Sequence, residues 1–157
     1  MLAVGDIAPD FELSAVPAPV SLTQLRSRGA VVVVFYAEDS TPLCTRELAP
    51  FVNDHSDLAA LGAEVVAIGS DDLESHGEFA RRLGIPFPLA SDPDLVVARA
   101  FGVADQESQR AKRAVFVIGQ DGRLLHANPD YNPGISADYE SVLTALAKVC
   151  GVPKSFG

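Results

Sequence analysis

The chain has little of several residue types, and each shortage excludes a class of protein. Only two cysteines occur among its 157 residues, which is too few for a disulfide framework in a chain of this size. The chain has 12 Lys and Arg residues against 21 Asp and Glu residues, which gives a net charge of −9, and the basic residues form no stripe. We therefore expect neither nucleic acid nor an anionic lipid surface as a partner.

Long apolar runs, a basic leader and metal-ligand spacings are also missing. No stretch approaches about 18 consecutive apolar residues, so the sequence predicts no membrane-spanning helix. Residues 1–10 contain no signal-peptide pattern, and the two cysteines are expected to be reduced thiols. A cytoplasmic protein is therefore expected. His55, His76 and His126 lie far apart and neither cysteine has a partner at a ligand spacing, so no metal or other cofactor is expected. We interpret the three histidines as ordinary structural residues.

The apolar pattern predicts one α/β domain over residues 1–157, because 48% of the chain is hydrophobic and its length suits a single core. Three apolar runs predict core strands: residues 31–36, 63–69 and 114–118. The first of them has no polar alternation, so it is predicted to be buried on both faces. Helical spacing predicts four helices between and after them: residues 41–61, 70–83, 92–101 and 136–150. Strands that alternate with helices favour a three-layer sandwich.

Several features around these elements are also predicted. A short N-terminal hairpin with a loose loop is expected over residues 11–22, and residues 104–112 are polar and read as a loop. Asp121-Gly122 is typical of a hairpin turn after the third strand. Pro50 lies inside the first long helix and removes one backbone hydrogen bond, so we expect a kink there.

The segment between the first strand and this helix contains the chain's most suggestive cysteine. Thr41 can cap the helix through its hydroxyl, and Pro42 suits the first helical position. Cys44 is then the third helical residue, close to unpaired backbone N–H groups and to the positive end of the helix dipole. A cysteine in this position tends to ionise to the reactive thiolate. The alternative is a buried, inert cysteine.

A basic residue is expected at the same edge of the sheet. Sites in α/β sheets gather at the carboxyl ends of the parallel strands, and Cys44 follows that end of strand 31–36. If strand 114–118 runs antiparallel to strand 31–36, Arg113 begins at this edge as well. An arginine before a strand is usually a solvated flank, but this geometry would bring it to the sulfur.

Residues 35–47, with the sequence FYAEDSTPLCTRE, resemble the active-site motif of the peroxiredoxins. The subgroup that they most resemble is the one named after the bacterioferritin comigratory protein. Four further segments are similar to that family in the expected order: residues 4–13, 71–76, 91–94 and 113–122. The similarity therefore spans most of the chain.

The resemblance implies a thioredoxin-like fold with a central mixed sheet, and reduction of hydrogen peroxide and organic hydroperoxides through a cysteine sulfenic acid. By position, Cys44 corresponds to the peroxidatic cysteine and Thr41 to the residue that orients the peroxide. Arg113 corresponds to the residue that holds the thiolate and the developing charge. Glu47 occupies a position where the family often has a polar residue that supports the arginine.

Two positions depart from the family pattern. Ala37 stands where the family usually has a proline thought to shield the sulfur, so its loss could loosen the loop or widen the pocket. Ala49 stands where many members of the subgroup have a second, resolving cysteine. Cys150 is the only internal candidate for that role, but it falls on the apolar stripe of the last helix. We expect a one-cysteine cycle in which thioredoxin or a low-molecular-weight thiol reduces the sulfenic acid, in a monomer or homodimer.

Ionisation alone does not make a fast peroxidase. A thiol with a pKa of about 8.5 is roughly 3% thiolate at pH 7, against about 90% for a pKa of about 6. The lower basicity costs on the order of tenfold in nucleophilicity, so the net gain is only a few-fold. The remaining rate must come from alignment of the peroxide and from stabilised charge on its oxygens.

Two other functions fit the same fold. A thiol–disulfide oxidoreductase would need a second cysteine three positions after Cys44, where this chain has Glu47. The second alternative is a non-catalytic peroxide sensor or scaffold, in which Ala37 would mark the loss of catalytic function. The presence of Thr41, Cys44 and Arg113 argues against such a loss.

Overall fold

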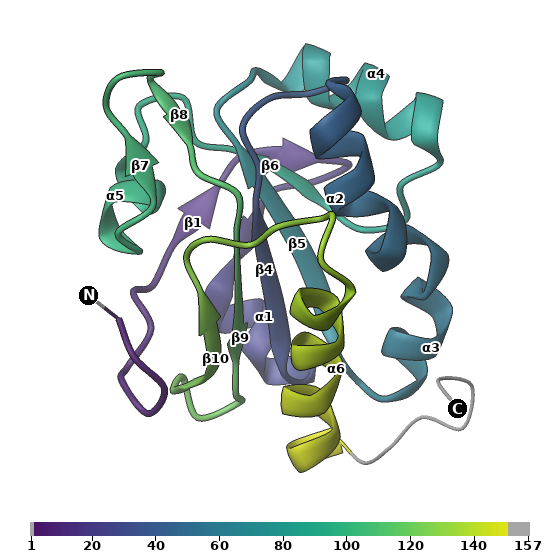
Figure 1. The fold of residues 1–157 in the computed structure, drawn as a ribbon, viewed down its shortest axis with the longest axis vertical. Helices are drawn as coiled ribbons and strands as arrows, with labels where there is room; N and C mark the ends of the chain where they lie inside the picture. Colours follow the sequence, from purple (N-terminus) through teal and green to yellow (C-terminus); the bar gives the residue numbers. More distant parts are fainter. Residues whose placement is uncertain (1, 151–157) are drawn as a thin grey trace.

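A computed structural model describes residues 2–150 of the chain, apart from the side chain of Cys150. Figure 1 shows the course of the chain. The helices and strands follow in this order: β1 (Glu12–Leu13), β2 (Ala15–Val16), β3 (Val20–Ser21), α1 (Leu22–Arg28), β4 (Val31–Phe35), α2 (Pro42–Asn53), α3 (His55–Ala60), β5 (Glu64–Gly69), α4 (Leu73–Leu83), β6 (Leu89–Ser91), α5 (Val96–Ala100), β7 (Ala104–Asp105), β8 (Arg110–Ala111), β9 (Ala114–Ile118), β10 (Leu124–Asn128) and α6 (Ser136–Cys150).

A mixed sheet of six strands forms the middle of the molecule, in the order β10-β9-β4-β5-β6-β2. Strands β4, β5 and β6 run parallel, whereas β9, β10 and β2 each run antiparallel to their neighbours. The central mixed sheet and the antiparallel course of strand 114–118 are therefore confirmed. The β1–β3 pair forms the expected N-terminal hairpin, but β2, inside its predicted loop, joins the main sheet beside β6.

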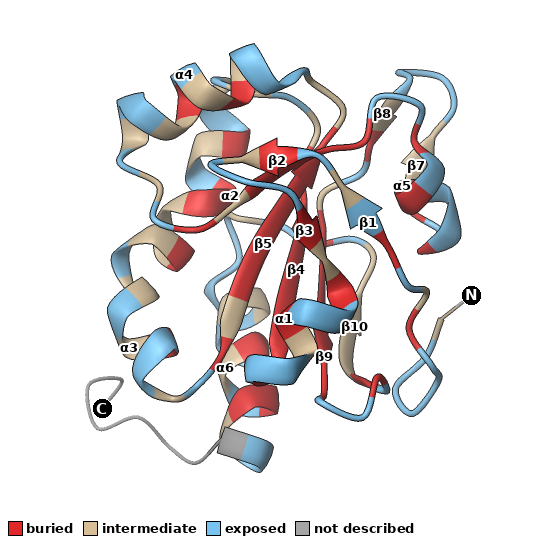
Figure 2. Ribbon diagram, turned by 180° about the vertical axis from the view of Figure 1, so that it is seen from behind, coloured by how far each residue is buried: buried red, intermediate tan, exposed pale blue. Residues whose placement is uncertain are grey.

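Helices cover both faces of this sheet (Figures 1 and 2), which confirms the three-layer sandwich. Side chains on β4 alternate between the two faces: Val31, Val33 and Phe35 pack with α1 and α5, and Val32 and Val34 pack with the other helices. Neither side of β4 carries a polar residue, so both of its faces can be buried. Figure 2 shows the burial of the central strands in red.

Further segments differ from the sequence prediction. The helix predicted over residues 92–101 is shorter, because α5 begins only at Val96. The helix predicted over residues 41–61 is two helices, α2 and α3, which meet at Asp54. Pro50 gives no N–H to the preceding turn, and four residues later the backbone of Asp54 leaves helical geometry, with φ −97° and ψ 6°. The loop predicted over residues 104–112 is the β7–β8 hairpin, which Gln109 turns with a positive φ of 57°. None of the described helices has the length and apolar character needed to cross a membrane.

Candidate active site

The start of α2 has the geometry that the sequence predicts. Thr41 is the N-cap, and its Oγ1 atom accepts a hydrogen bond of 3.2 Å from the Cys44 N–H. Pro42 is the first helical residue, so Cys44 is the third. Cys44 is only 1% exposed and belongs to the apolar cluster on the α2 face of the sheet. Burial alone would suit an inert cysteine, so its neighbours decide its character.

Arg113 lies at the same edge of the sheet. In the antiparallel pairing of β4 with β9, Phe35 stands opposite Ala114, so Arg113 immediately precedes β9 where the chain leaves β4 toward α2. Figure 1 shows α2 beginning at the upper end of the sheet, where the β8–β9 connection also passes. Arg113 is half-buried and lines a cleft of about 610 Å³ together with Ala37 and Leu43. The expected meeting of these two segments at one edge is therefore confirmed.

Glu47 lies one turn after Cys44 on α2 and is completely buried, at 0% exposure. Neither of its carboxyl oxygens has a hydrogen-bond partner among the described residues, and the buried Nε of Arg113 has none either. Burial raises the pKa of Glu47 well above the usual carboxyl range, Cys44 raises it further, and the Arg113 guanidinium lowers it. Glu47, Cys44 and Arg113 thus share one electrostatic environment.

Cys150 is the one candidate residue that the structure does not bring to this group. It is the last residue of α6, which ends at the lower end of the molecule in Figure 1, whereas α2 begins at the upper end. The side chain of Cys150 lies outside the described part of the chain.

Sequence reasoning missed a buried polar network beside the segment that leads to Thr41. The Asp39 carboxylate accepts hydrogen bonds from the Tyr36 hydroxyl at 2.6 Å, from the Ser75 hydroxyl at 2.7 Å and from His76 Nδ1 at 2.7 Å. His76 was interpreted as an ordinary structural residue, yet it is 0% exposed and paired with a carboxylate. One signal was available: His76 lies on the apolar stripe of α4 with Phe79, where a buried ionisable group needs a partner.

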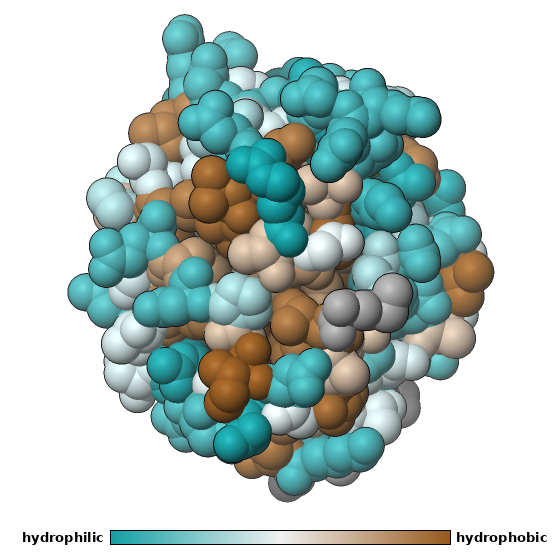
Figure 3. Space-filling view, turned by 90° about the vertical axis from the view of Figure 1, so that its left-hand side faces the viewer, coloured by the Kyte–Doolittle hydropathy of each residue, from teal (hydrophilic) through white to brown (hydrophobic). Residues whose placement is uncertain are grey.

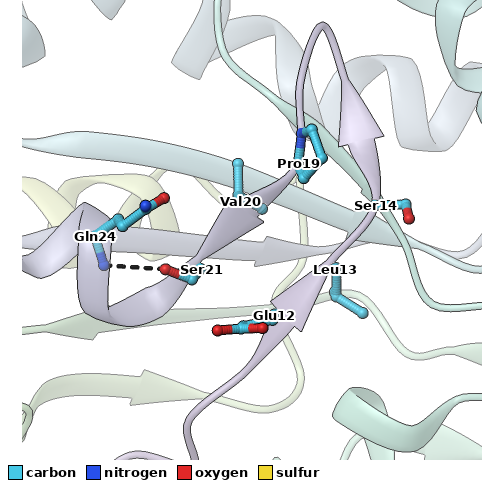
Figure 4. A pocket seen from close by; sticks show the side chains of 7 residues that line it. All are labelled: Glu12, Leu13, Ser14, Pro19, Val20, Ser21 and Gln24. Carbon is cyan, nitrogen blue, oxygen red and sulfur yellow. Dashed lines mark hydrogen bonds between the residues drawn. The ribbon is translucent and has the colours of Figure 1, made fainter.

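Two further features lie on the surface formed by the described residues. A hollow of about 410 Å³ lies beside the N-terminal hairpin (Figure 4), and among the described residues that line it Glu12 is the only charged one. The Ser21 hydroxyl there accepts a hydrogen bond from the Gln24 N–H and caps α1. The face that carries β1, α5 and the β7–β8 hairpin mixes hydrophobic and hydrophilic residues (Figures 1 and 3). Within residues 2–150, no group of three or more His, Cys, Asp and Glu side chains could hold a metal ion.

The sequence of the chain matches a known family. The model of the AhpC/TSA family matches residues 4–127, so the chain belongs to this family.

Its relatives are peroxiredoxins, which are thiol-dependent peroxidases. The chain is 32% identical over 131 residues to peroxiredoxin Bcp of Bacillus subtilis, covering 79% of this chain and 83% of that protein. It is 34% identical over 121 residues to peroxiredoxin 2 of Thermoplasma acidophilum, covering 73% of this chain but only 60% of that protein.

A solved structure agrees with the fold. The crystal structure of peroxidoxin BcpB from Mycobacterium tuberculosis superposes with a TM-score of 0.85 at 30% sequence identity, covering 95% of this chain and 99% of that one. The thioredoxin-like fold and the resemblance to the bacterioferritin comigratory protein subgroup are therefore confirmed.

Proposed function

We propose that this protein reduces hydrogen peroxide and organic hydroperoxides, with Cys44 as the attacking thiol and Thr41, Arg113 and Glu47 as its supporting residues. The observation that carries this proposal is the meeting of the α2 N-terminus with the start of β9 at one sheet edge. That meeting places the guanidinium-bearing Arg113 at the same sheet edge as a buried sulfur that lies at the positive end of the α2 dipole.

The reaction begins when the Cys44 thiolate attacks the terminal oxygen of the peroxide. An S–O bond forms as the O–O bond breaks, the sulfur is oxidised to a sulfenic acid, and the leaving oxygen takes a proton to depart as water or an alcohol. The Thr41 hydroxyl accepts from the Cys44 N–H, so its own proton is free to be donated to the peroxide. Arg113, whose buried Nε has no partner among the described residues, supplies a donor for the charge that develops on the departing oxygen.

Glu47 has a supporting role in this proposal. A full negative charge on its buried carboxyl would repel the thiolate, and its raised pKa favours the neutral form next to the anionic sulfur. The carboxyl oxygens do not hydrogen-bond the guanidinium in the structure, so Glu47 and Arg113 influence each other through charge.

The sulfenic acid must be reduced by a second thiol. We infer a one-cysteine cycle with thioredoxin or a low-molecular-weight thiol as the reductant, in a cytoplasmic monomer or homodimer. The alternative, resolution by Cys150, would require local unfolding or a partner subunit to bring the end of α6 to the start of α2. A disulfide between Cys44 and Cys150 in peroxide-treated protein would favour that alternative.

The test is the consumption of hydrogen peroxide by the reduced protein, compared between wild type and Cys44→Ser. We expect Cys44→Ser to lose the reaction and the matched variant Cys150→Ser to retain it. Equal consumption by wild type and Cys44→Ser would contradict the proposal. A turnover assay with thioredoxin and its reductase identifies the reductant and separates an enzyme from a peroxide sensor, which reacts once without turning over.

A further inference from the structure

The segment that joins β4 to α2 is held by a set of hydrogen bonds, with Ala37 packed at the margin of the apolar cluster. None of residues 37–40 is classed as buried, although the Asp39 side chain is only 3% exposed. Ser40 has a positive φ of 65°, a conformation that a residue with a Cβ rarely adopts, and it immediately precedes the cap residue Thr41. Such a backbone persists only where the surrounding contacts fix it.

Asp39 is the centre of those contacts. Its carboxylate accepts from Tyr36, Ser75 and His76, and its N–H donates to Asp71 Oδ2 at 2.7 Å. These contacts tie the segment to the end of β4 and to the start of α4. They leave little freedom for the residues on either side of Asp39.

The surroundings of the His76 ring require a proton on each of its two ring nitrogens. Nδ1 lies 2.7 Å from a carboxylate oxygen of Asp39, and Nε2 lies 3.1 Å from the carbonyl oxygen of Ala90 on β6. Both of these groups are acceptors when Asp39 is ionised, so both ring nitrogens must donate. The ring that satisfies this geometry is an imidazolium, buried against a carboxylate.

The other charged and titratable groups around this pair agree with that assignment. Tyr36 meets the ring from the end of β4, with its hydroxyl 3.2 Å from His76 Nδ1. Asp71 adds a second negative charge from the β5–α4 connection, and Arg110 on β8 neutralises it with an ion pair of 2.7 Å. Burial would lower the pKa of His76, but the hydrogen bond and charge of Asp39 outweigh it and raise that pKa above its ordinary value.

The network reaches the candidate active site along two routes. Along the chain, Asp39 is two residues before Thr41, whose hydroxyl caps α2 and is expected to meet the peroxide. Through space, the Tyr36 ring packs in the same apolar cluster as Cys44. A change at Asp39 would therefore shift both the cap and the packing around the sulfur.

We propose that His76, as an imidazolium paired with Asp39, is a positioning residue for the chemistry of Cys44. It fixes residues 37–40 and so places the Thr41 hydroxyl and the first turn of α2. Loss of the His76 proton as the pH rises removes one of its two donated bonds and loosens this segment. This inference rests on the proposed function in one respect: peroxide reduction is the reaction whose rate reports the positioning.

The first experiment uses the unmodified protein. NMR of the histidine side-chain nitrogens gives the titration midpoint of His76, and rapid mixing gives the rate constant of Cys44 oxidation by hydrogen peroxide over the same pH range. We expect His76 to be doubly protonated at pH 7, and the oxidation rate to fall at high pH with the same midpoint. A neutral His76 ring at pH 7, or a rate that stays level while His76 titrates, would overturn the proposal.

Two variants sharpen the result. Asp39→Asn keeps an acceptor oxygen but removes the charge, so it should move the fall in rate to lower pH. His76→Gln should remove the fall and lower the rate constant by about 10- to 100-fold, the range expected for a small misplacement of reacting groups. His126→Gln, a half-buried histidine on β10, is the matched control and should leave both the rate and its pH profile unchanged. If His76→Gln does not fold, Asp39→Asn and the wild-type titration still decide the question.

Alkylation of Cys44 by iodoacetamide keeps this test apart from the test of the proposed function, because it needs no peroxide. A protein that reduces no peroxide, but whose alkylation rate follows the His76 titration, contradicts the proposed function alone. A protein that reduces peroxide with a rate indifferent to His76 contradicts the positioning role alone.

Discussion

The two sides of Cys44 are built in opposite ways. On the side of residues 36–40, the buried polar groups of Tyr36, Asp39 and His76 all have hydrogen-bond partners. On the other side, both carboxyl oxygens of Glu47 and the Nε of Arg113 are buried without a partner within residues 2–150. The surroundings of Cys44 thus contain one set of buried polar groups that have hydrogen-bond partners and one set that have none.

This difference suggests that one group of residues supports the site and the other takes part in the reaction. An unsatisfied buried polar group costs about 1–3 kcal/mol, so a fold keeps one only where other interactions compensate or where a ligand uses it. The satisfied side offsets the strain of Ser40, which is of order 1–3 kcal/mol for a residue outside the favoured regions. In the mechanism that we propose, the first side holds the geometry and the second leaves a donor free for the charge of the reaction.

Removal of the arginine should have the largest effect, because it takes the free donor from the reactive side. We expect Arg113→Met to lower the rate constant of Cys44 oxidation by about 10²–10³-fold, the range for loss of one preorganised donor to a developing oxyanion. Arg113→Lys keeps the charge without the fork of N–H groups and should fall between wild type and Arg113→Met. Stopped-flow kinetics measure both variants, and a wild-type rate in Arg113→Met would mean that the guanidinium takes no part.

A methyl group at Gly69 should disturb the satisfied side alone. A Cβ there would lie 2.9 Å from Cζ of the Tyr36 ring, so the ring must move. We expect Gly69→Ala to lower the free energy of unfolding by about 1–3 kcal/mol, as overpacking does, and to slow peroxide reduction. Gly77→Ala on α4 is the matched control, since its Cβ would meet only the end of Arg81 at 3.7 Å. Urea unfolding should show Gly77→Ala to be as stable as wild type or more stable.

The His76–Asp39 pair should also make stability depend on pH. The pKa of His76 is raised in the folded protein, so its contribution is complete below the unfolded value and is lost as the pH rises through the folded pKa. The pKa of Asp39 is lowered, because bonds from His76, Tyr36 and Ser75 outweigh burial, so its contribution is lost only in acid. Urea unfolding of wild type should give a falling stability from about pH 6.5 upward, and Asp39→Asn should flatten this slope. Parallel slopes in the two proteins would place the pH dependence elsewhere.

Glu47→Gln should have the smallest effect on the rate of peroxide reduction, and it should raise the stability of the protein rather than lower it. The raised pKa of Glu47 means that the folded protein disfavours its charged form, so wild type is penalised increasingly as the pH rises above the unfolded pKa. An amide of the same shape removes this penalty. We expect higher stability at pH 8 and at most a few-fold loss of rate. Lower stability at pH 8 would show that the ionised carboxylate is paired in solution.

The sequence was most informative where a signal is local. The apolar run of β4, the Thr41-Pro42 start of α2 and the hairpin turn after β9 each depend on neighbouring residues, and the structure confirms them. The edge shared by Cys44 and Arg113 needed one further assumption, the direction of β9, and that assumption was correct.

The features that were missed depend on tertiary contacts. Asp39 and His76 are 37 positions apart, and Asp71 and Arg110 are 39 apart, so no short motif contains either pair. The β7–β8 hairpin carries polar residues of the kind that are common in loops, so its sequence does not predict strands. Its strands pair in the folded protein, where Ala111 is buried. The division of the first long helix at Asp54 was expected only as a kink at Pro50.

The most direct measurement of the central claim is to trap the oxidised cysteine. Reduced protein is mixed with one equivalent of hydrogen peroxide in the presence of a diketone that reacts with sulfenic acids, and the adduct is located by mass spectrometry of its peptides. If Cys44 at the start of α2 is the reactive thiol, the adduct forms on Cys44 and disappears in Cys44→Ser. An adduct on Cys150 with Cys44 unmodified, or the same adduct yield in Cys44→Ser, would contradict that assignment.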